Sequence, residues 1–297
     1  IKCSDGTIAE NVLGGGGPQG AFGARLWDDS IGLLTRSGTD IPPGPEKMLL
    51  DIDVDLSGWV RYPDMPTAHI KYPFSEIEYR ERSDELLEEL KRVMVGIREM
   101  TSRPITPPKT YTQPNVIHLI TEDSNAEMIK TALAVQEQGA IFSLEPIIMP
   151  AYHNQEDMLS VIPQVDIVTP DYPAASTIAG SKDPLEVIKY WSKLGPSLVA
   201  IRHGYHGSYT WDIEHDQFWH IPPVPVEVVD VTGAGNCYGG GLIVGWDNSK
   251  DAKISGCYAS VSASFLVRQF GLPKMTPELQ SEADKLLEQA LASAKPL

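Results

Sequence analysis

Short apolar segments alternate with helix-like segments along the middle of the chain, and this alternation limits the possible folds more than any other feature. The apolar segments are 116–120, 140–144, 165–168 and 198–201, and the helical patterns between them are 125–138 and 184–193. Strands that are buried on both faces of a sheet have this composition, because crossover helices cover both faces. The sequence predicts an α/β fold, a parallel sheet between two layers of helices.

The ends of the chain extend this pattern. Helices are predicted at 21–27, 84–93, 255–270 and 281–294 from apolar periodicity, glycine boundaries and a serine cap. Residues 47–79 instead alternate apolar and polar side chains around Pro63 and Pro66, which favours irregular strands or a lid. We expect one domain over 1–297, with a small β lid contributed mainly by 1–13 and 40–80.

Charge and composition exclude several classes of partner. The chain has 24 basic and 40 acidic residues, a net charge of -16, so its surface repels a nucleic-acid backbone. No apolar run reaches the roughly 18 residues that span a bilayer. The three cysteines, Cys3, Cys237 and Cys257, form no closely spaced pair. We therefore expect a soluble protein of a reducing compartment, intracellular and cytoplasmic, with no nucleic-acid or membrane partner.

The segment 229–242 carries the strongest chemical signal. We interpret it as a strand that ends at Asp230, a turn of small residues and a helix. The turn residues Gly233, Ala234 and Gly235 let backbone N–H groups converge on an anion at a helix N-terminus. A glycine-rich turn taken alone also occurs for steric reasons. We predict that these three residues form an anion hole, and a purely steric role of the turn is the alternative.

The longer string around this turn resembles the second signature of the ribokinase-like PfkB carbohydrate kinases. Asp230, Thr232 and the three turn residues match the pattern. Asn236 does not, because the family has an aspartate there that activates the sugar hydroxyl. The resemblance therefore places Asn236 at the catalytic base position without the base.

Three other segments resemble family motifs in the same order along the chain. Residues 14–21 are similar to the di-glycine hinge motif, with Gln19 in place of a sugar-binding asparagine, and 199–208 and 258–264 are similar to the nucleotide-binding turn and the adenine-pocket helix. The resemblance implies nucleotide-binding roles for Thr232, Arg202, Gly204, Tyr205, Gly207 and Ser260, and substrate-binding roles for Gly14, Gly15, Gln19 and Asp230.

Departures from the family pattern concern its acidic residues. The family's magnesium-organising Asn-x-x-Glu corresponds to Asp171 through Ala174, so the glutamate has become alanine and only Asp171 is a weak metal candidate. Glu145 stands where the family usually has an aspartate, which keeps a carboxylate. The family's first strand is expected before Gly14, where too few residues precede it. Together with Asn236, these changes resemble a divergent, largely fungal branch associated with maintenance of a killer virus.

These substitutions set two functional hypotheses side by side. An amide has no useful basicity, and general base catalysis contributes typically 10²–10⁴-fold in rate. We expect a protein that binds nucleotide and a small ligand, a sugar or nucleoside, but has lost or weakened phosphoryl transfer, in a binding, scaffold or regulatory role. The alternative is an active kinase with an altered base, which would use ATP and Mg²⁺. The expected assembly is a homodimer through the lid, with a monomer as the alternative.

Overall fold

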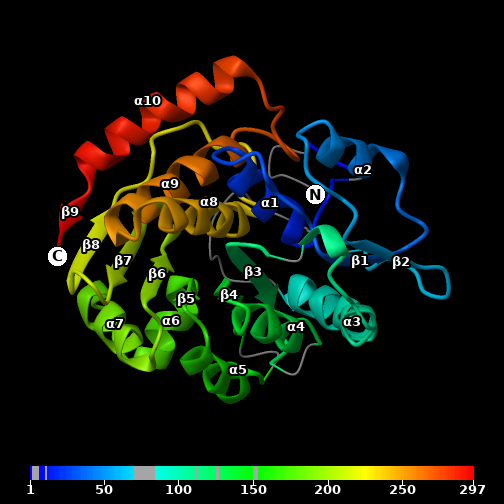
Figure 1. Ribbon diagram of the computed structural model, residues 1–297, viewed down its shortest axis with the longest axis horizontal. Coiled ribbons are helices and arrows are strands. Elements are labelled where there is room, and N and C mark those ends of the chain that lie inside the picture. The colour runs from blue at the N-terminus through cyan, green and yellow to red at the C-terminus, as the bar shows by residue number, and fades with distance from the viewer. Residues whose placement is uncertain (2–6, 11, 70–83, 112, 125–126, 150–152) are drawn as a thin grey trace.

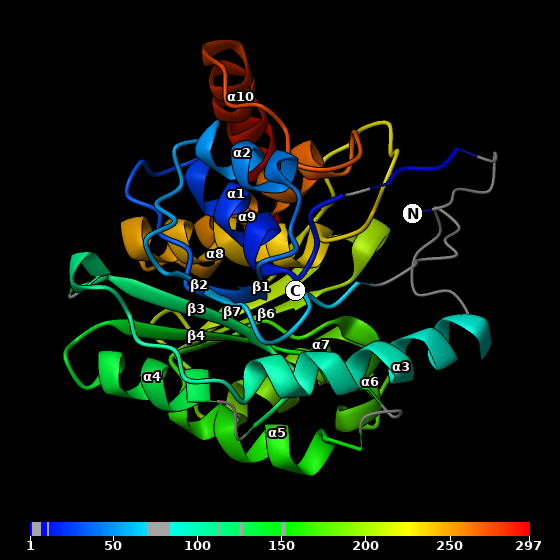
Figure 2. The same ribbon diagram turned by 90° about the vertical axis from the view of Figure 1, so that its right-hand side faces the viewer.

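The protein is a layered α/β structure in which one twisted sheet lies between two groups of helices (Figures 1 and 2). The structure, a computed structural model, describes residues 1, 7–10, 12–69, 84–111, 113–124, 127–149 and 153–297. Among these residues, no helix has both the length and the apolar character that crossing a membrane requires.

The main sheet has seven strands in the order β3-β4-β5-β6-β7-β8-β9 among the described residues. The first four strands are parallel and the last three antiparallel. Their bounds are β3 Val116–Thr121, β4 Ile141–Pro146, β5 Ile167–Val168, β6 Leu198–Arg202, β7 Ser208–Asp212, β8 Gln217–Ile221 and β9 Lys295–Pro296. The predicted parallel sheet is confirmed, and the carboxyl ends of β3 to β6 meet at one edge.

Helices cover both faces of this sheet, as the apolar strands require. One layer contains α1 Gly17–Arg25, α8 Ala234–Ser249, α9 Ala252–Leu266 and α10 Pro277–Ser293. The opposite layer contains α4 Glu127–Gln136, α5 Gln155–Val161, α6 Tyr172–Ala179 and α7 Pro184–Trp191, with α3 Asp84–Thr101 along its side (Figure 2). The predicted helices are present, although α9 ends at Leu266 instead of residue 270.

A second, small sheet consists of the parallel strands β1 Thr35–Gly38 and β2 Trp59–Tyr62. The predicted lid segments, 1–13 and 40–80, contain β2 but not β1, and residues 2–6, 11 and 70–80 lie outside the described part. The segment 47–50, interpreted as irregular strand, belongs instead to α2 Pro43–Leu50. The sequence of this segment is also compatible with a helix, because Leu49 faces the core while Leu50 is exposed.

The strand predicted to end at Asp230 is absent: residues 222–229 form no sheet ladder. Pro222, Pro223 and Pro225 lack the N–H groups that a ladder requires. The chain is held instead at its end, where the backbone N–H groups of Val229 and Asp230 both donate to the carbonyl oxygen of Val267. The turn that follows is therefore anchored to the C-terminal end of α9, not to the sheet.

Helix α8 packs unusually close to α1 and α9, because glycines face both neighbours. A methyl group at Gly240 would lie 2.0 Å from the carbonyl oxygen of Gly20, and one at Gly241 would lie 2.4 Å from the hydroxyl of Ser262. That hydroxyl is already occupied, since it donates to the carbonyl oxygen of Gly23 and accepts from the indole of Trp27. These contacts fix where the N-terminus of α8 lies.

We expect Gly240→Ala to lower the free energy of unfolding by about 1–3 kcal/mol, the usual effect of overpacking. The measurement is chemical denaturation followed by circular dichroism. Gly96→Ala in α3 is the matched control, because nothing lies within 4 Å of the added methyl group. Alanine is the better helix former, so this control should gain about 0.5–1 kcal/mol. Equal effects of the two substitutions would contradict the packing argument.

Candidate nucleotide and ligand site

The N-terminus of α8 forms a turn at the carboxyl edge of the sheet. Gly233 precedes the helix in a left-handed conformation, with φ 82°, which suits glycine. Before it, the carboxylate of Asp230 accepts a hydrogen bond from the N–H of Thr232 at 3.0 Å and fixes the entry to the turn. The first N–H groups of a helix lack partners within the helix, and its dipole favours negative charge there. The turn can therefore hold an anion such as a phosphate.

Arg202 adds a positive charge to this turn from the end of β6. A methyl group at Gly235 would lie 2.2 Å from Nη1 of Arg202, so the guanidinium group lies directly against the first turn of α8. Its side chain is 12% exposed. The structure thus brings together two of the predicted elements, the anion hole and the nucleotide-binding arginine.

Glu145, at the end of β4, joins this arginine to Asn236. Its Oε1 atom accepts a hydrogen bond from Nδ2 of Asn236 at 2.8 Å and one from Nη1 of Arg202 at 2.5 Å. The carboxylate is only 3% exposed. A buried charge is stable only when paired and hydrogen-bonded, and here one cation and one amide supply both.

His118 completes the cluster on the other side of Glu145. Its Nε2 atom lies 3.7 Å from Oε2 of Glu145, and its Nδ1 atom lies 2.9 Å from the hydroxyl of Ser143. Burial by itself would raise the pKa of Glu145, but the charge of Arg202, with a smaller contribution from the nearby His118, holds that pKa below its usual value. Glu145 is therefore ionised at neutral pH.

The contact with Glu145 gives Asn236 a defined chemical role. Its amide donates to a carboxylate, which an ionised aspartate cannot do. An aspartate at this position would face the Glu145 carboxylate at hydrogen-bond distance, and two such carboxylates do not both ionise. The amide at the base position is therefore matched to its neighbour, and it offers no lone pair basic enough to accept a proton from a hydroxyl group.

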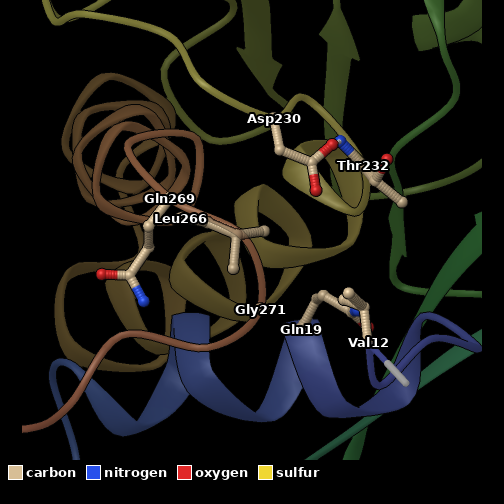
Figure 3. A pocket seen from close by; sticks show the side chains of 7 residues that line it. All are labelled: Val12, Gln19, Asp230, Thr232, Leu266, Gln269 and Gly271. Atoms are coloured by element: carbon tan, nitrogen blue, oxygen red, sulfur yellow. Dashed lines mark hydrogen bonds between the residues drawn. The ribbon is translucent and has the colours of Figure 1, made fainter. Parts of the chain in front are cut away.

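Gln19 and Asp230 line a small hollow beside this turn (Figure 3). The remaining lining residues are Val12, Thr232, Leu266, Gln269 and Gly271. Gln19 is 4% exposed, and its Nε2 atom donates to the carbonyl oxygen of Leu13. Its Oε1 atom and the hydroxyl of Thr232 are buried with no hydrogen-bond partner among the described residues. The hollow therefore offers unused acceptor oxygens to a ligand.

The other predicted site residues lie around this centre. Gly14 and Gly15 are exposed and do not line the hollow, so their substrate-binding role stays a prediction. Tyr205 is 68% exposed in the turn Gly204–His206, and Gly207 follows it with φ 87°. Ser260 is buried in α9, where its hydroxyl donates to the carbonyl oxygen of Pro222. These residues lie on the segments that lead to the turn.

The donors in place do not fit a magnesium ion held by the protein. Ala174 has no oxygen side chain at the family's glutamate position, and Asp171, which precedes α6, is bridged to the backbone of Arg202. The nearby carboxylate of Glu145 is already neutralised by a guanidinium group. Among the described residues no group of three or more acidic, histidine or cysteine side chains is suited to a metal, so a magnesium ion here would take most of its ligands from substrate phosphates and water.

Sequence reasoning gave too little weight to two residues of this cluster. Glu145 was recognised only as a conservative replacement, and His118 was assigned to a buried strand. The sequence contains a signal for both: His118 is a polar residue at the third position of the strand 116–120, and Glu145 directly follows the strand 140–144. Because neighbouring parallel strands end at the same edge, such residues lie close together when their side chains share a face.

These features define a class of proteins, the ribokinase-like α/β proteins. A solved Escherichia coli structure, described as a ribokinase II in complex with ATP and Mg²⁺, superimposes with a TM-score of 0.71 at 18% identity, covering 94% of this chain and 89% of that one. A nucleoside kinase of Methanocaldococcus jannaschii gives a TM-score of 0.65 at 18% identity, covering 94% and 87%. At this identity the likeness concerns the fold.

Comparison of the sequence with known proteins narrows this class to one family. The profile of the pfkB family carbohydrate kinases matches residues 106–279. The chain is also 27% identical to a cytidine kinase of Thermococcus kodakarensis over 242 residues, 80% of this chain and 82% of the relative. An uncharacterized protein of Schizosaccharomyces pombe is 22% identical over 93% of this chain and 83% of its own length. The protein belongs to the PfkB family.

Two histidines near this site give the fold opposite responses to pH. His203 stacks on Tyr172 with ring centroids 3.6 Å apart, and burial, followed by the charges of His206 and His220, lowers the pKa of His203 to about 4. His215 is exposed, and its hydrogen bond with Asp212 raises its pKa. The folded state therefore disfavours the proton on His203 and favours it on His215.

We expect His203→Gln to remove a pH dependence of stability. A depressed pKa contributes stability that is complete above the unfolded value, about 6.5, and is lost as the pH falls toward 4. The melting temperature of the wild type minus that of the variant should therefore fall between pH 6.5 and 4. For His215→Gln the same difference should fall as the pH rises above 6.5, because that pKa is raised. Two slopes of the same sign would contradict the assignment.

Proposed function

We propose that this protein is a nucleotide-binding and small-ligand-binding member of the PfkB family in which phosphoryl transfer is lost or strongly weakened. One observation carries the proposal. The residue at the family's base position is Asn236, whose amide is engaged as a donor to the buried carboxylate of Glu145. A side chain in that role cannot also remove a proton from an acceptor hydroxyl.

The binding half of the proposal rests on the turn before α8. The N-terminus of the helix and the guanidinium group of Arg202 lie together, so a nucleotide phosphate finds both N–H donors and positive charge. Neither feature needs the missing base. Replacing a carboxylate by an amide at Asn236 also removes repulsion toward phosphate.

The proposed loss of phosphoryl transfer rests on two groups that the site lacks. Phosphoryl transfer depends on positioning and on neutralising charge in the transition state, and the family's magnesium-organising glutamate is replaced by Ala174. Loss of a general base lowers the rate by about 10²–10⁴-fold. The two deficits act on different parts of the reaction, so their effects on the rate combine.

One observation favours a second candidate, an active kinase with an altered base. The carboxylate of Glu145 lies 2.8 Å from the amide of Asn236, so a carboxylate is present one side chain away from the family's base position. Its depressed pKa and its ion pair with Arg202 make it a poor proton acceptor. This candidate therefore ranks second.

A charge exchange between the two positions tests the proposal. In the double variant Asn236→Asp/Glu145→Gln, the carboxylate moves to the base position while an amide still faces it, and the net charge is unchanged. We expect ADP release with an acceptor to rise about 10²-fold or more over the wild type. The assay uses ATP, Mg²⁺ and a panel of cytidine, other nucleosides, ribose and fructose. Cytidine comes first because the relative from Thermococcus kodakarensis is a cytidine kinase.

The single variants separate the two candidates. If the wild type already turns over at 1–100 s⁻¹, the usual range for kinases, and Glu145→Gln abolishes that rate, the second candidate is correct. If the wild type is nearly inactive and Glu145→Gln changes nothing, the proposal stands. Calorimetric titration of ATP adds an independent measurement: Asn236→Asp should bind more weakly than the wild type, and tighter binding would count against the proposal.

A homodimer through the sheet of β1 and β2 remains part of the proposal. A two-stranded sheet has unpaired edges, and such edges invite pairing with a second copy. Sedimentation of the purified chain distinguishes this dimer from the monomer that the sequence also allows.

A further inference from the structure

Arg36 is a buried cation that no side chain among the described residues neutralises. It lies in β1, is 8% exposed, and both its Nε and Nη2 atoms are buried without a hydrogen-bond partner. Leaving a buried charge unpaired costs several kcal/mol.

The two unpartnered atoms form one edge of the guanidinium group. Nε and Nη2 present parallel N–H bonds on the same side, which is the geometry that binds the two oxygens of a carboxylate or phosphate in a bidentate manner. Two unpartnered nitrogens on different edges of the group would not present this geometry. The available edge of Arg36 therefore has the shape of an oxyanion site.

The face of β1 that carries Arg36 is turned away from the hydrophobic core. The neighbouring Ser37 accepts a hydrogen bond from the indole of Trp59, which packs on the core that contains α1 and α2. Successive side chains of a strand alternate, so Arg36 points to the opposite face. The titratable groups acting on it are Tyr62 and the carboxylate of Glu127; burial lowers the pKa of Arg36 and these groups oppose the shift.

Contacts connect this strand to the base position. A methyl group added at Gly16 would lie 3.2 Å from the nearest side-chain atoms of Asn236 and Ile120. A methyl group added at Gly17 would lie 3.1 Å from the side chain of Leu33. Leu33 leads directly into β1. Glu127 begins α4, which follows the carboxyl end of β3. The charge of Glu127 acts on Arg36, which links Arg36 to the carboxyl end of β3 through the start of α4.

We propose that Arg36 binds an oxyanion group, a carboxylate or phosphate, carried by the small ligand that this site takes. The ligand class is then acidic sugars or sugar phosphates rather than neutral sugars. The inference rests on the proposed function for the existence of a ligand site, but it concerns a separate group in a separate sheet. Glu127 is not the partner, because it is 2.6 Å from Lys130 and makes no hydrogen bond to the unpartnered edge of Arg36.

Matched pairs of probes test the proposal by calorimetry. Gluconate is compared with glucose, and ribose 5-phosphate with ribose, in the presence of ADP so that the turn before α8 is occupied. We expect the wild type to bind an acidic member of these pairs more tightly than its neutral counterpart. Arg36→Met should weaken that binding roughly 10- to 100-fold, the effect of losing a charge-assisted bidentate pair. The two pairs also distinguish a carboxylate from a phosphate.

A second readout concerns the protein without ligand. Because methionine removes a buried unpaired charge at similar length, Arg36→Met should raise the melting temperature by about 2–4 °C. Arg36→Lys keeps the charge but not the planar edge, so it should bind the acidic probe about 10-fold more weakly than the wild type. Arg61→Met is the control, since Arg61 lies on the partner strand and is paired with Glu46; it should leave probe affinity unchanged.

Several results would overturn the proposal. These are equal affinity of the wild type for acidic and neutral probes, unchanged affinity in Arg36→Met, or a lowered melting temperature of that variant without ligand, which would show that Arg36 has a structural partner. Loss of ADP binding in Arg36→Met would place the residue in the nucleotide site and would also overturn it. ADP binding by the wild type is read separately, so failure of the proposed function is distinguishable from failure of this inference.

Discussion

The close packing of α8 against α1 and α9 is the constraint on which the site depends. Backbone and hydroxyl groups occupy the space where side chains of Gly240 and Gly241 would be, so the helices approach to a distance that only glycine permits. This packing holds the N-terminus of α8 at the carboxyl edge of the sheet. The turn at Gly233, the base position and the contact with Gly16 all follow from it. A phosphate site built from backbone N–H groups needs that rigidity, because its donors cannot move independently of the helix.

A second constraint is the buried charge of Glu145. Its carboxylate must be paired, and Arg202 and Asn236 are the groups that pair it. Asn236 occupies the position from which the family's aspartate would act on a hydroxyl group. The engagement of Arg202 and Asn236 with Glu145 links stability of the fold to loss of chemistry at the site. The amide at position 236 is thus one member of a hydrogen-bonded cluster, with His118 on its far side.

Arg36 and Glu145 are both buried charged side chains, but they differ in how they are paired. Glu145 is paired within the chain through its Oε1 atom, which accepts from Arg202 and Asn236, while its Oε2 atom is buried without a hydrogen-bond partner among the described residues. Arg36 has two guanidinium nitrogens, Nε and Nη2, that lack a hydrogen-bond partner among the described residues. An unsatisfied buried charge requires an explanation, and in our proposal a ligand supplies the partner of Arg36. The contrast separates the part of the site that is structurally fixed from the part that is available for recognition.

The sequence by itself determined the class of fold, the order of strands and helices from 116 to 201, and the turn at Gly233 with its mismatch at Asn236. Those features are local, since periodicity and glycine placement act within a few residues. Only the tertiary structure decided that prolines stop a strand before Asp230, that 47–50 is helical, and that Glu145, His118 and Arg36 carry buried charge or polarity. Each of these depends on contacts between segments far apart in the chain. Burial and pairing are properties of such contacts, and no spacing along one strand specifies them.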